Sequence, residues 1–233
     1  MSTRLPEVLR LLEDYTQAHG TSGHEDAVRA IFVRELRGRA FSADGLGGVL
    51  AAPAKEKGGP RVVLTAHMDE IGFIVRHIDD KGFLAVGPIG GSDRTLAPAR
   101  RIRLFGSKGI VPGVIGNTAI HLRDKANEKP ADWKDLFIDV GASSAKGVEK
   151  LGIRVGTPAI FVDDAIEFAE DRIVGRALDN RVGGFILTLV LEELRAGKKR
   201  PVATTFAANA VQEEVGCRGA QMVAHRIRPS VAI

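Results

Sequence analysis

Arg61-Val-Val-Leu-Thr-Ala-His-Met-Asp-Glu70 is a short, apolar, β-branched run that closes on polar residues. This pattern predicts a buried strand that ends at the edge of a sheet. Side chains two residues apart share a face of a strand, so we expect His67 and Asp69 to point the same way and Met68 to pack on the other side. An imidazole beside a carboxylate is how proteins hold a metal-binding histidine in one tautomer and orientation. A solvated histidine at a strand end gives the same short pattern, and two later stretches are needed to favour the metal site.

Composition narrows the class of protein. The chain has 233 residues, of which 44% are hydrophobic, enough to bury a core in one large or two small domains. The formal net charge is only +4, and the basic residues cluster without interleaved aromatics, so we do not expect nucleic-acid binding. No apolar run approaches the length of a membrane span, and we expect no membrane partner. The single cysteine, Cys217, excludes an internal disulfide framework and predicts a cytoplasmic protein.

Helical spacing dominates the chain before the quoted strand. Apolar residues recur at helical spacing in residues 6–18 and 28–36, which predicts two helices. Ser22-Gly-His-Glu25 has the form of a capping box and is expected to begin the second helix. Between residues 71 and 161 the texture changes to short β-like pieces separated by glycine turns, and only residues 143–151 look helical. Many short strands of this kind are typical of a small barrel or sandwich.

Helix and strand patterns return toward the C-terminal end. Asp179-Asn180 opens an apolar helix that ends near Gly197, and residues 201–211 form a buried strand that runs into Glu213-Glu214. We therefore predict an α/β fold with a mixed-sheet domain flanked by helices and an inserted small β-barrel-like domain. The predicted boundaries are 1–70 plus 163–233 for the first domain and 71–162 for the second.

Polar residues collect where apolar elements end, and this arrangement favours a metal. Strand ends and neighbouring helix N-termini form the crevice of an α/β sheet, which would bring Asp179 and the two glutamates toward His67. For Asp179 taken alone, an ordinary helix N-cap is the preferred interpretation. Carboxylates gathered in one crevice raise each other's pKa unless a cation neutralises them. A histidine with carboxylates suits zinc, cobalt or manganese, and of two adjacent glutamates one can bind metal while the other accepts a proton in hydrolysis.

Three motifs in order along the chain resemble one known family. They are Thr65-Ala-His-Met-Asp-Glu-Ile-Gly-Phe73, Ala177-Leu-Asp-Asn-Arg-Val-Gly183 and Gln212-Glu-Glu-Val-Gly216. Together they closely resemble the glutamyl aminopeptidase/cellulase-M family, the tetrahedral aminopeptidases, and the likeness covers essentially the whole chain. The resemblance implies a metallopeptidase with two divalent metal ions that removes N-terminal residues from peptide substrates by means of metal-activated water. It also implies self-association through the inserted β domain into a homo-oligomer.

The resemblance also assigns roles residue by residue. It implies that His67, Asp179 and Glu214 are metal ligands, with Asp179 shared between the ions, that Glu213 is the general base and that Asp69 orients His67. The metal would be zinc, with cobalt or manganese as alternatives. Structural roles are expected for Glu70, His24, His77 and His121, and no ligand role for Cys217.

The chain also departs from the family pattern. Family members are longer, and their further metal ligands have no counterpart before Ile233, so we expect a C-terminally truncated family member. Two hypotheses follow: the chain is the larger part of an active aminopeptidase, or it is a catalytically defective member that keeps only the fold and the oligomerisation. Because some relatives are called endoglucanases, a glycosidase is a third hypothesis. Such an enzyme would use two carboxylates and normally no metal.

Overall fold

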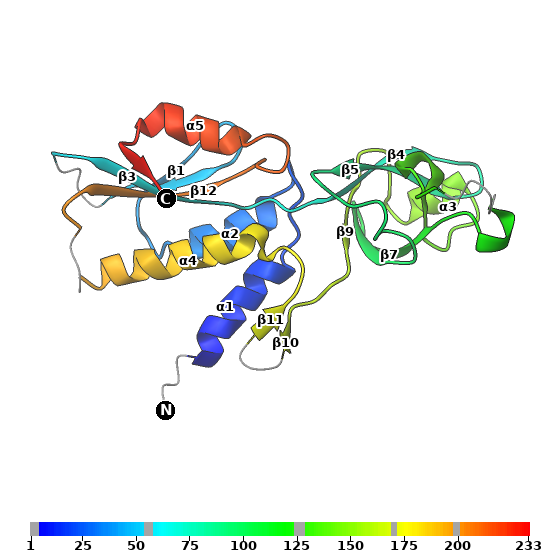
Figure 1. Ribbon diagram of the computed structural model, residues 1–233, viewed down its shortest axis with the longest axis horizontal. Coiled ribbons are helices and arrows are strands. Elements are labelled where there is room, and N and C mark those ends of the chain that lie inside the picture. The colour runs from blue at the N-terminus through cyan, green and yellow to red at the C-terminus, as the bar shows by residue number, and fades with distance from the viewer. Residues whose placement is uncertain (1–4, 54–57, 124–128, 169–171, 198–200) are drawn as a thin grey trace. The chain divides into compact units, whose positions relative to one another are not determined.

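The computed structural model describes residues 5–53, 58–123, 129–168, 172–197 and 201–233, and Figure 1 shows their helices and strands. The chain forms two compact units, one from Met1–Glu70 and Asp164–Ile233 and the other from Ile71–Asp163. The chain therefore leaves the first unit directly after the Arg61–Glu70 stretch and returns to it at Asp164. Among the described residues, no helix combines the length and the apolar character needed to cross a bilayer.

The first unit is built on a mixed sheet whose strands follow the order β1-β2-β12-β3-β13. These strands are β1 (Phe41–Ala43), β2 (Val49–Ala51), β3 (Arg61–His67), β12 (Thr204–Ala210) and β13 (Val231–Ala232). β3 and β12 run parallel, and their register places Ala210 opposite His67. Because both strands end at the same edge, the residues that follow them emerge side by side, as they do at the ligand-binding edge of many α/β sheets.

Helices cover both faces of this sheet. They are α1 (Leu5–Gln17), α2 (Asp26–Glu35), α4 (Leu178–Arg195) and α5 (Arg218–Ile227). Figure 1 shows α5 on one face of the sheet and α4 with α2 on the other. The alternation along β12 explains this, because Phe206 shares a core cluster with Val223 of α5, whereas Ala207 shares one with Leu187 of α4. A hairpin of β10 (Ile166–Phe168) and β11 (Arg172–Val174) also belongs to this unit.

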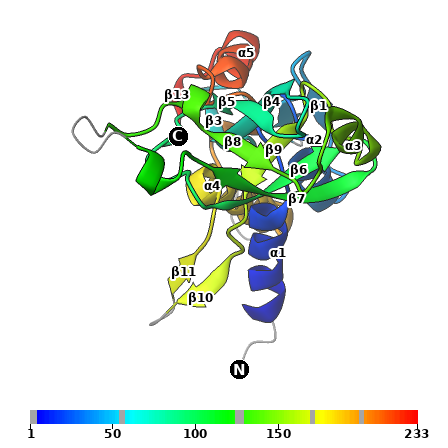
Figure 2. The ribbon, with the colours of Figure 1, turned by 90° about the vertical axis from the view of Figure 1, so that its right-hand side faces the viewer.

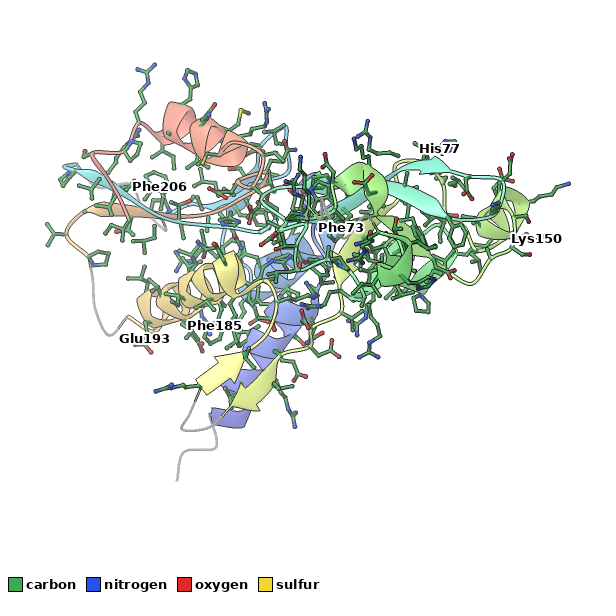
Figure 3. All side chains as sticks on the ribbon, turned by 45° about the vertical axis from the view of Figure 1, so that its right-hand side comes forward. Phe73, His77, Lys150, Phe185, Glu193 and Phe206 are labelled. Carbon is green, nitrogen blue, oxygen red and sulfur yellow. The ribbon has the colours of Figure 1, made fainter. Side chains whose placement is uncertain are left out.

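The second unit is a closed barrel whose strands follow the order β4-β5-β8-β7-β6-β9 (Figure 2). They are β4 (Gly72–Ile78), β5 (Leu84–Ile89), β6 (Arg101–Gly106), β7 (Gly109–Gly116), β8 (Phe137–Asp139) and β9 (Pro158–Phe161), with helix α3 (Ala145–Lys150) and 3-10 turns at Ile120–Leu122 and Trp133–Asp135. Phe73 of β4 (Figure 3) is fully buried and contacts the rings of Trp133 and Phe161. The predicted α/β class with a barrel-like part is confirmed.

The segment between α1 and α2 differs from the predicted capping box. The N-cap of α2 is Glu25, and its side chain makes no capping hydrogen bond. Ser22 instead donates its hydroxyl to Asp69 Oδ2 at 2.6 Å, and Glu25 Oε1 accepts from the backbone N–H groups of Gly23 and Gln212. A hydrogen bond to a buried carboxylate is stronger than a neutral cap. The prediction was wrong because the Ser22 hydroxyl binds a carboxylate 47 residues away, and Glu25 accepts hydrogen bonds from Gly23 and from the distant Gln212.

Candidate metal centre

His67, the last residue of β3, lies between carboxylates with its side chain 9% exposed. Its Nδ1 is 3.3 Å from Asp69 Oδ1 and 3.1 Å from the Asp69 carbonyl oxygen. Its Nε2 lies 3.2 Å from Asp179 Oδ1 and 3.6 Å from Glu213 Oε2. When Nδ1 carries the proton and donates to Asp69, the lone pair of Nε2 faces the other carboxylates. That tautomer is the one in which a histidine binds a metal.

The charges around His67 favour a cation at this position. Burial opposes protonation of the imidazole, but the hydrogen bond and charge of Asp69, with the charges of Glu213 and Asp179, outweigh it and raise the pKa of His67. The same negative surroundings that attract a proton to Nε2 would attract a divalent cation.

Asp69 is fully buried and connects three segments of the chain. Besides His67 and the hydroxyl of Ser22, its carboxylate accepts the backbone N–H of Glu213 at 2.9 Å and of Glu214 at 3.0 Å. Burial alone would raise the pKa of Asp69, but the hydrogen bonds from His67, Ser22 and these two backbone groups outweigh it, and the pKa lies below its usual range. Asp69 therefore stays ionised, and it fixes both the imidazole and the backbone of the two glutamates.

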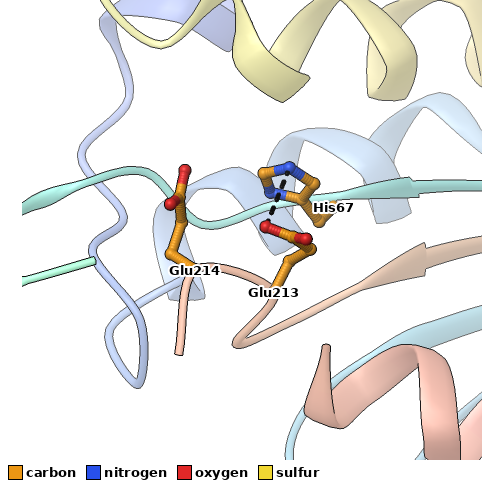
Figure 4. Close-up of side chains that lie close together, drawn as sticks. All are labelled: His67, Glu213 and Glu214. Atoms are coloured by element: carbon orange, nitrogen blue, oxygen red, sulfur yellow. Dashed lines mark ion pairs between the residues drawn. The ribbon is translucent and has the colours of Figure 1, made fainter. Parts of the chain in front are cut away.

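Glu213 and Glu214 follow β12 and lie beside His67 (Figure 4). One ligand atom from each of these three residues lies within 4.8 Å of the others. Burial, followed by repulsion from Asp69, Glu213 and Asp179, raises the pKa of Glu214, although His67 acts in the opposite sense. One nitrogen and several oxygens in a cluster whose carboxylates repel one another is a donor set that fits a divalent cation such as zinc, cobalt or manganese.

Asp179 reaches His67 from the start of α4. The N-cap of α4 is Ala177, and Asp179 has non-helical backbone angles, with φ −84° and ψ 110°. Among the described residues, its carboxylate pairs with the His67 imidazole and with no backbone N–H of the helix start. Its side chain is 87% exposed, so the cluster is open to solvent on this side. The structure thus brings His67, Asp69, Asp179, Glu213 and Glu214 together at one edge of the sheet.

Several neighbours of this cluster were not assigned a role from the sequence. Arg176 and Arg181 both form ion pairs with Glu70, the residue after Asp69. Cys217 donates its thiol to Glu213 Oε1 at 3.2 Å. The local sequence contains no signal for the two arginine contacts, because Arg176 and Arg181 lie 106 and 111 positions from Glu70. His24, His77 and His121 are not part of the cluster that the structure describes.

Comparison with known proteins gives consistent matches. The family model described as M42 glutamyl aminopeptidase matches residues 47–233. "Putative aminopeptidase FrvX" of Escherichia coli (strain K12) is 38% identical over 232 residues, which cover 97% of this chain and 63% of that protein. "Lysyl aminopeptidase" of Pyrococcus furiosus is 35% identical over 229 residues, which cover 96% of this chain and 64% of that protein. The chain thus spans less than two thirds of the length of these relatives.

Solved structures agree with the sequence matches. The TET aminopeptidase from a marine sediment archaeon, Thaumarchaeota archaeon SCGC AB-539-E09, superposes with a TM-score of 0.92 at 32% identity, covering 97% of this chain and 65% of that one. The TET1 peptidase of Pyrococcus horikoshii superposes with a TM-score of 0.87 at 31% identity, covering 97% of this chain and 67% of that one. That peptidase is described as able to assemble into a tetrahedron or a large octahedral shell.

Proposed function

Since the chain belongs to the M42 glutamyl aminopeptidase family, we propose that the protein is a metal-dependent aminopeptidase that releases N-terminal residues from peptides. The observation that supports this most is the convergence of one imidazole and three carboxylates from three distant segments at one open edge of the sheet. A water-accessible cluster of this composition suits hydrolysis.

We assign three residues as the ligands that the described part of the chain contributes to two divalent cations. They are His67, Asp179 and Glu214, with Asp179 shared between the ions. Zinc is our first choice because it accepts nitrogen and oxygen donors together, and cobalt and manganese are the alternatives. When bound, such ions supply Lewis acidity toward a carbonyl oxygen and make a nucleophile available at neutral pH.

The remaining residues of the cluster move and hold protons. Asp69 accepts a hydrogen bond from the Nδ1–H group of His67, which leaves the lone pair of Nε2 free to bind a metal ion. Glu213 is the proposed general base, because its Oε2 faces the same space as Nε2 and its side chain is 39% exposed. Glu213 would accept a proton from the attacking water and later donate it to the leaving amine.

Two further parts of the proposal concern the whole protein. We propose that it self-associates through the inserted barrel, as a homo-oligomer, because apolar side chains such as Ile120 and Leu122 are 67% and 71% exposed there. The assemblies described for the TET1 relative support the same proposal.

We also propose a cytoplasmic location, which the single exposed thiol of Cys217 supports.

An assay with aminoacyl-anilide substrates tests the proposed function. We expect the purified protein to hydrolyse these substrates to the amino acid and the free aniline, to lose this activity after chelation and dialysis, and to regain it when zinc, cobalt or manganese is restored. A Glu149→Gln variant, altered at an exposed glutamate of α3, is the matched control and is expected to behave like the wild type. Undiminished activity in excess chelator, or hydrolysis of a β-glucan in place of the anilide, would overturn the proposal.

A further inference from the structure

We propose that Glu70 is a positioning residue that fixes the segment carrying Asp179 against the end of β3 that carries His67. Arg176 Nη1 donates to Glu70 Oε2, and Arg181 Nη2 donates to Glu70 Oε1 at 3.0 Å. These arginines stand three residues before and two residues after Asp179, so one carboxylate holds the segment at both of its ends. The functional meaning of this arrangement rests on the proposed role of Asp179 as a metal ligand.

Both ion pairs of Glu70 are buried, so their geometry is more strictly fixed than that of exposed pairs. The side chains of Glu70, Arg176 and Arg181 are 4%, 7% and 0% exposed. Exposed ion pairs stabilise little and move freely, whereas the loss of one partner from a buried pair leaves an uncompensated charge. Each oxygen of Glu70 takes one guanidinium, so a change of its position would disturb both pairs at once.

The two arginines are also anchored to the framework of the unit. Arg181 Nη1 donates to the carbonyls of Tyr15 and Ala18 at 2.9 and 3.1 Å, and Arg176 Nη2 donates to the carbonyl of Gln17 at 2.7 Å. Carbonyls at a helix C-terminus lack partners within the helix, so they are free to accept these bonds. The backbone N–H of Glu70 in turn donates to Gly20 at 2.9 Å, which joins β3 to the same corner.

Asp179 depends on this support because little else holds it. In the part of the chain that the structure describes, the Asp179 carboxylate forms its hydrogen bond and ion pair with His67. Asp179 and Asn180 lie outside regular helix geometry, and the Asp179 side chain is 87% exposed. Its distance of 3.2 Å from His67 Nε2 is therefore set by where the ends of its segment are fixed.

The test compares Glu70→Gln with a control that removes a buried side-chain hydrogen bond between α1 and α4 in which neither Glu70 nor the two arginine side chains take part. Tyr15→Phe is suitable, because the Tyr15 hydroxyl bonds Thr188 at 2.8 Å, whereas Arg181 bonds only the backbone carbonyl of Tyr15. Arg176→Lys is a milder second variant, since lysine keeps the charge but cannot bind Glu70 and Gln17 with a fork of N–H groups. It carries the same test if Glu70→Gln does not fold.

The first measurement is hydrogen–deuterium exchange of metal-free protein over residues 175–183. This segment includes the Arg181 N–H that donates to Ala177 at 3.1 Å. We expect faster exchange there in Glu70→Gln and no local change in Tyr15→Phe. Unchanged exchange in the folded variant, or the same local increase in Tyr15→Phe, would overturn the positioning role.

The second measurement is a titration with Co²⁺ followed by visible absorption. We expect Glu70→Gln to lower cobalt affinity at least tenfold, which is the size of effect usual for groups that orient a metal ligand, and Tyr15→Phe to leave it unchanged. Faster exchange with unaltered cobalt affinity would contradict positioning of Asp179. If the wild type binds no cobalt while the exchange result holds, the role of Glu70 in fixing the segment is supported and the proposed metal-dependent function is wrong.

Discussion

Glu213 and Glu214 are neighbours in the sequence, yet their surroundings give them different capacities. Glu213 extends toward His67, with 3.6 Å between Oε2 and Nε2, and its side chain is 39% exposed. Glu214 has its pKa raised by burial and by the surrounding carboxylates, a strain that a bound cation would remove. The Asp69 carboxylate accepts the backbone N–H of both residues, which fixes the position of each glutamate backbone relative to His67. These differences support our proposal that Glu213 is the base and Glu214 the ligand.

Glu213→Gln tests this separation. The amide keeps the shape of the side chain but cannot accept the proton of the attacking water, so we expect kcat to fall by about 10²–10⁴-fold. Metal content measured by elemental analysis is expected to stay at the wild-type level, with Glu149→Gln as the unaffected control. Near-normal kcat in Glu213→Gln would show that another group is the base.

His19 gives a prediction for the dependence of stability on pH. Burial lowers the pKa of His19 below 6.5, and Arg176 and Arg181 act in the same sense, whereas Glu70 opposes it. The unfolded chain therefore binds more protons than the folded chain below about pH 6.5, and the free energy of unfolding falls as the pH falls through that range. We expect His19→Gln to lose less stability than the wild type between pH 7.5 and 5.5 in urea unfolding. Equal losses in the two proteins would refute this.

At the scale of elements, the corner where α1 meets β3 and α4 has no spare space. A Cβ at Gly20 would lie 2.9 Å from Arg181 Nη2 and 3.1 Å from Val28 Cγ2. The guanidinium is buried and bonded to several carbonyls, so it cannot move away freely. At Gly45, by contrast, a Cβ would meet nothing within 4 Å.

We expect Gly20→Ala to lower the free energy of unfolding by about 1–3 kcal/mol through overpacking. Gly45→Ala, as the control, is expected to change it by less than about 0.5 kcal/mol. Urea unfolding followed by circular dichroism measures both. If the two substitutions have equal effects, the corner is not as tightly packed as the contacts indicate.

Most elements followed from local pattern, and the exceptions have a physical reason. The helices predicted over residues 6–18 and 28–36 correspond to α1 (Leu5–Gln17) and α2 (Asp26–Glu35), because apolar residues recur there at helical spacing. The capping box at Ser22 failed because its hydroxyl binds a carboxylate 47 residues away. The role of Arg181 was missed for the same reason, since neither partner is near the other in sequence. Local patterns predict elements, whereas buried charge pairs are set by the tertiary fold.

At the scale of the whole molecule, the barrel offers the surface on which our proposal of self-association rests. Ile120 and Leu122 lie on a short 3-10 turn and are largely exposed, which is unfavourable for apolar side chains unless they meet a partner. We expect the double variant I120D/L122D to form smaller assemblies than the wild type in size-exclusion chromatography with light scattering. Met222→Asp on α5, which is 42% exposed, serves as the control. An unchanged size for the double variant would place the contact elsewhere.

The centre itself depends on residues that the fold gathers from three separated stretches of the chain. Crystals grown with zinc or cobalt, with data collected on both sides of the metal absorption edge, test this most directly. We predict anomalous density about 2.0–2.2 Å from His67 Nε2 and from carboxylate oxygens of Asp179 and Glu214. Metal density away from these side chains, or none at saturating metal, would contradict the account.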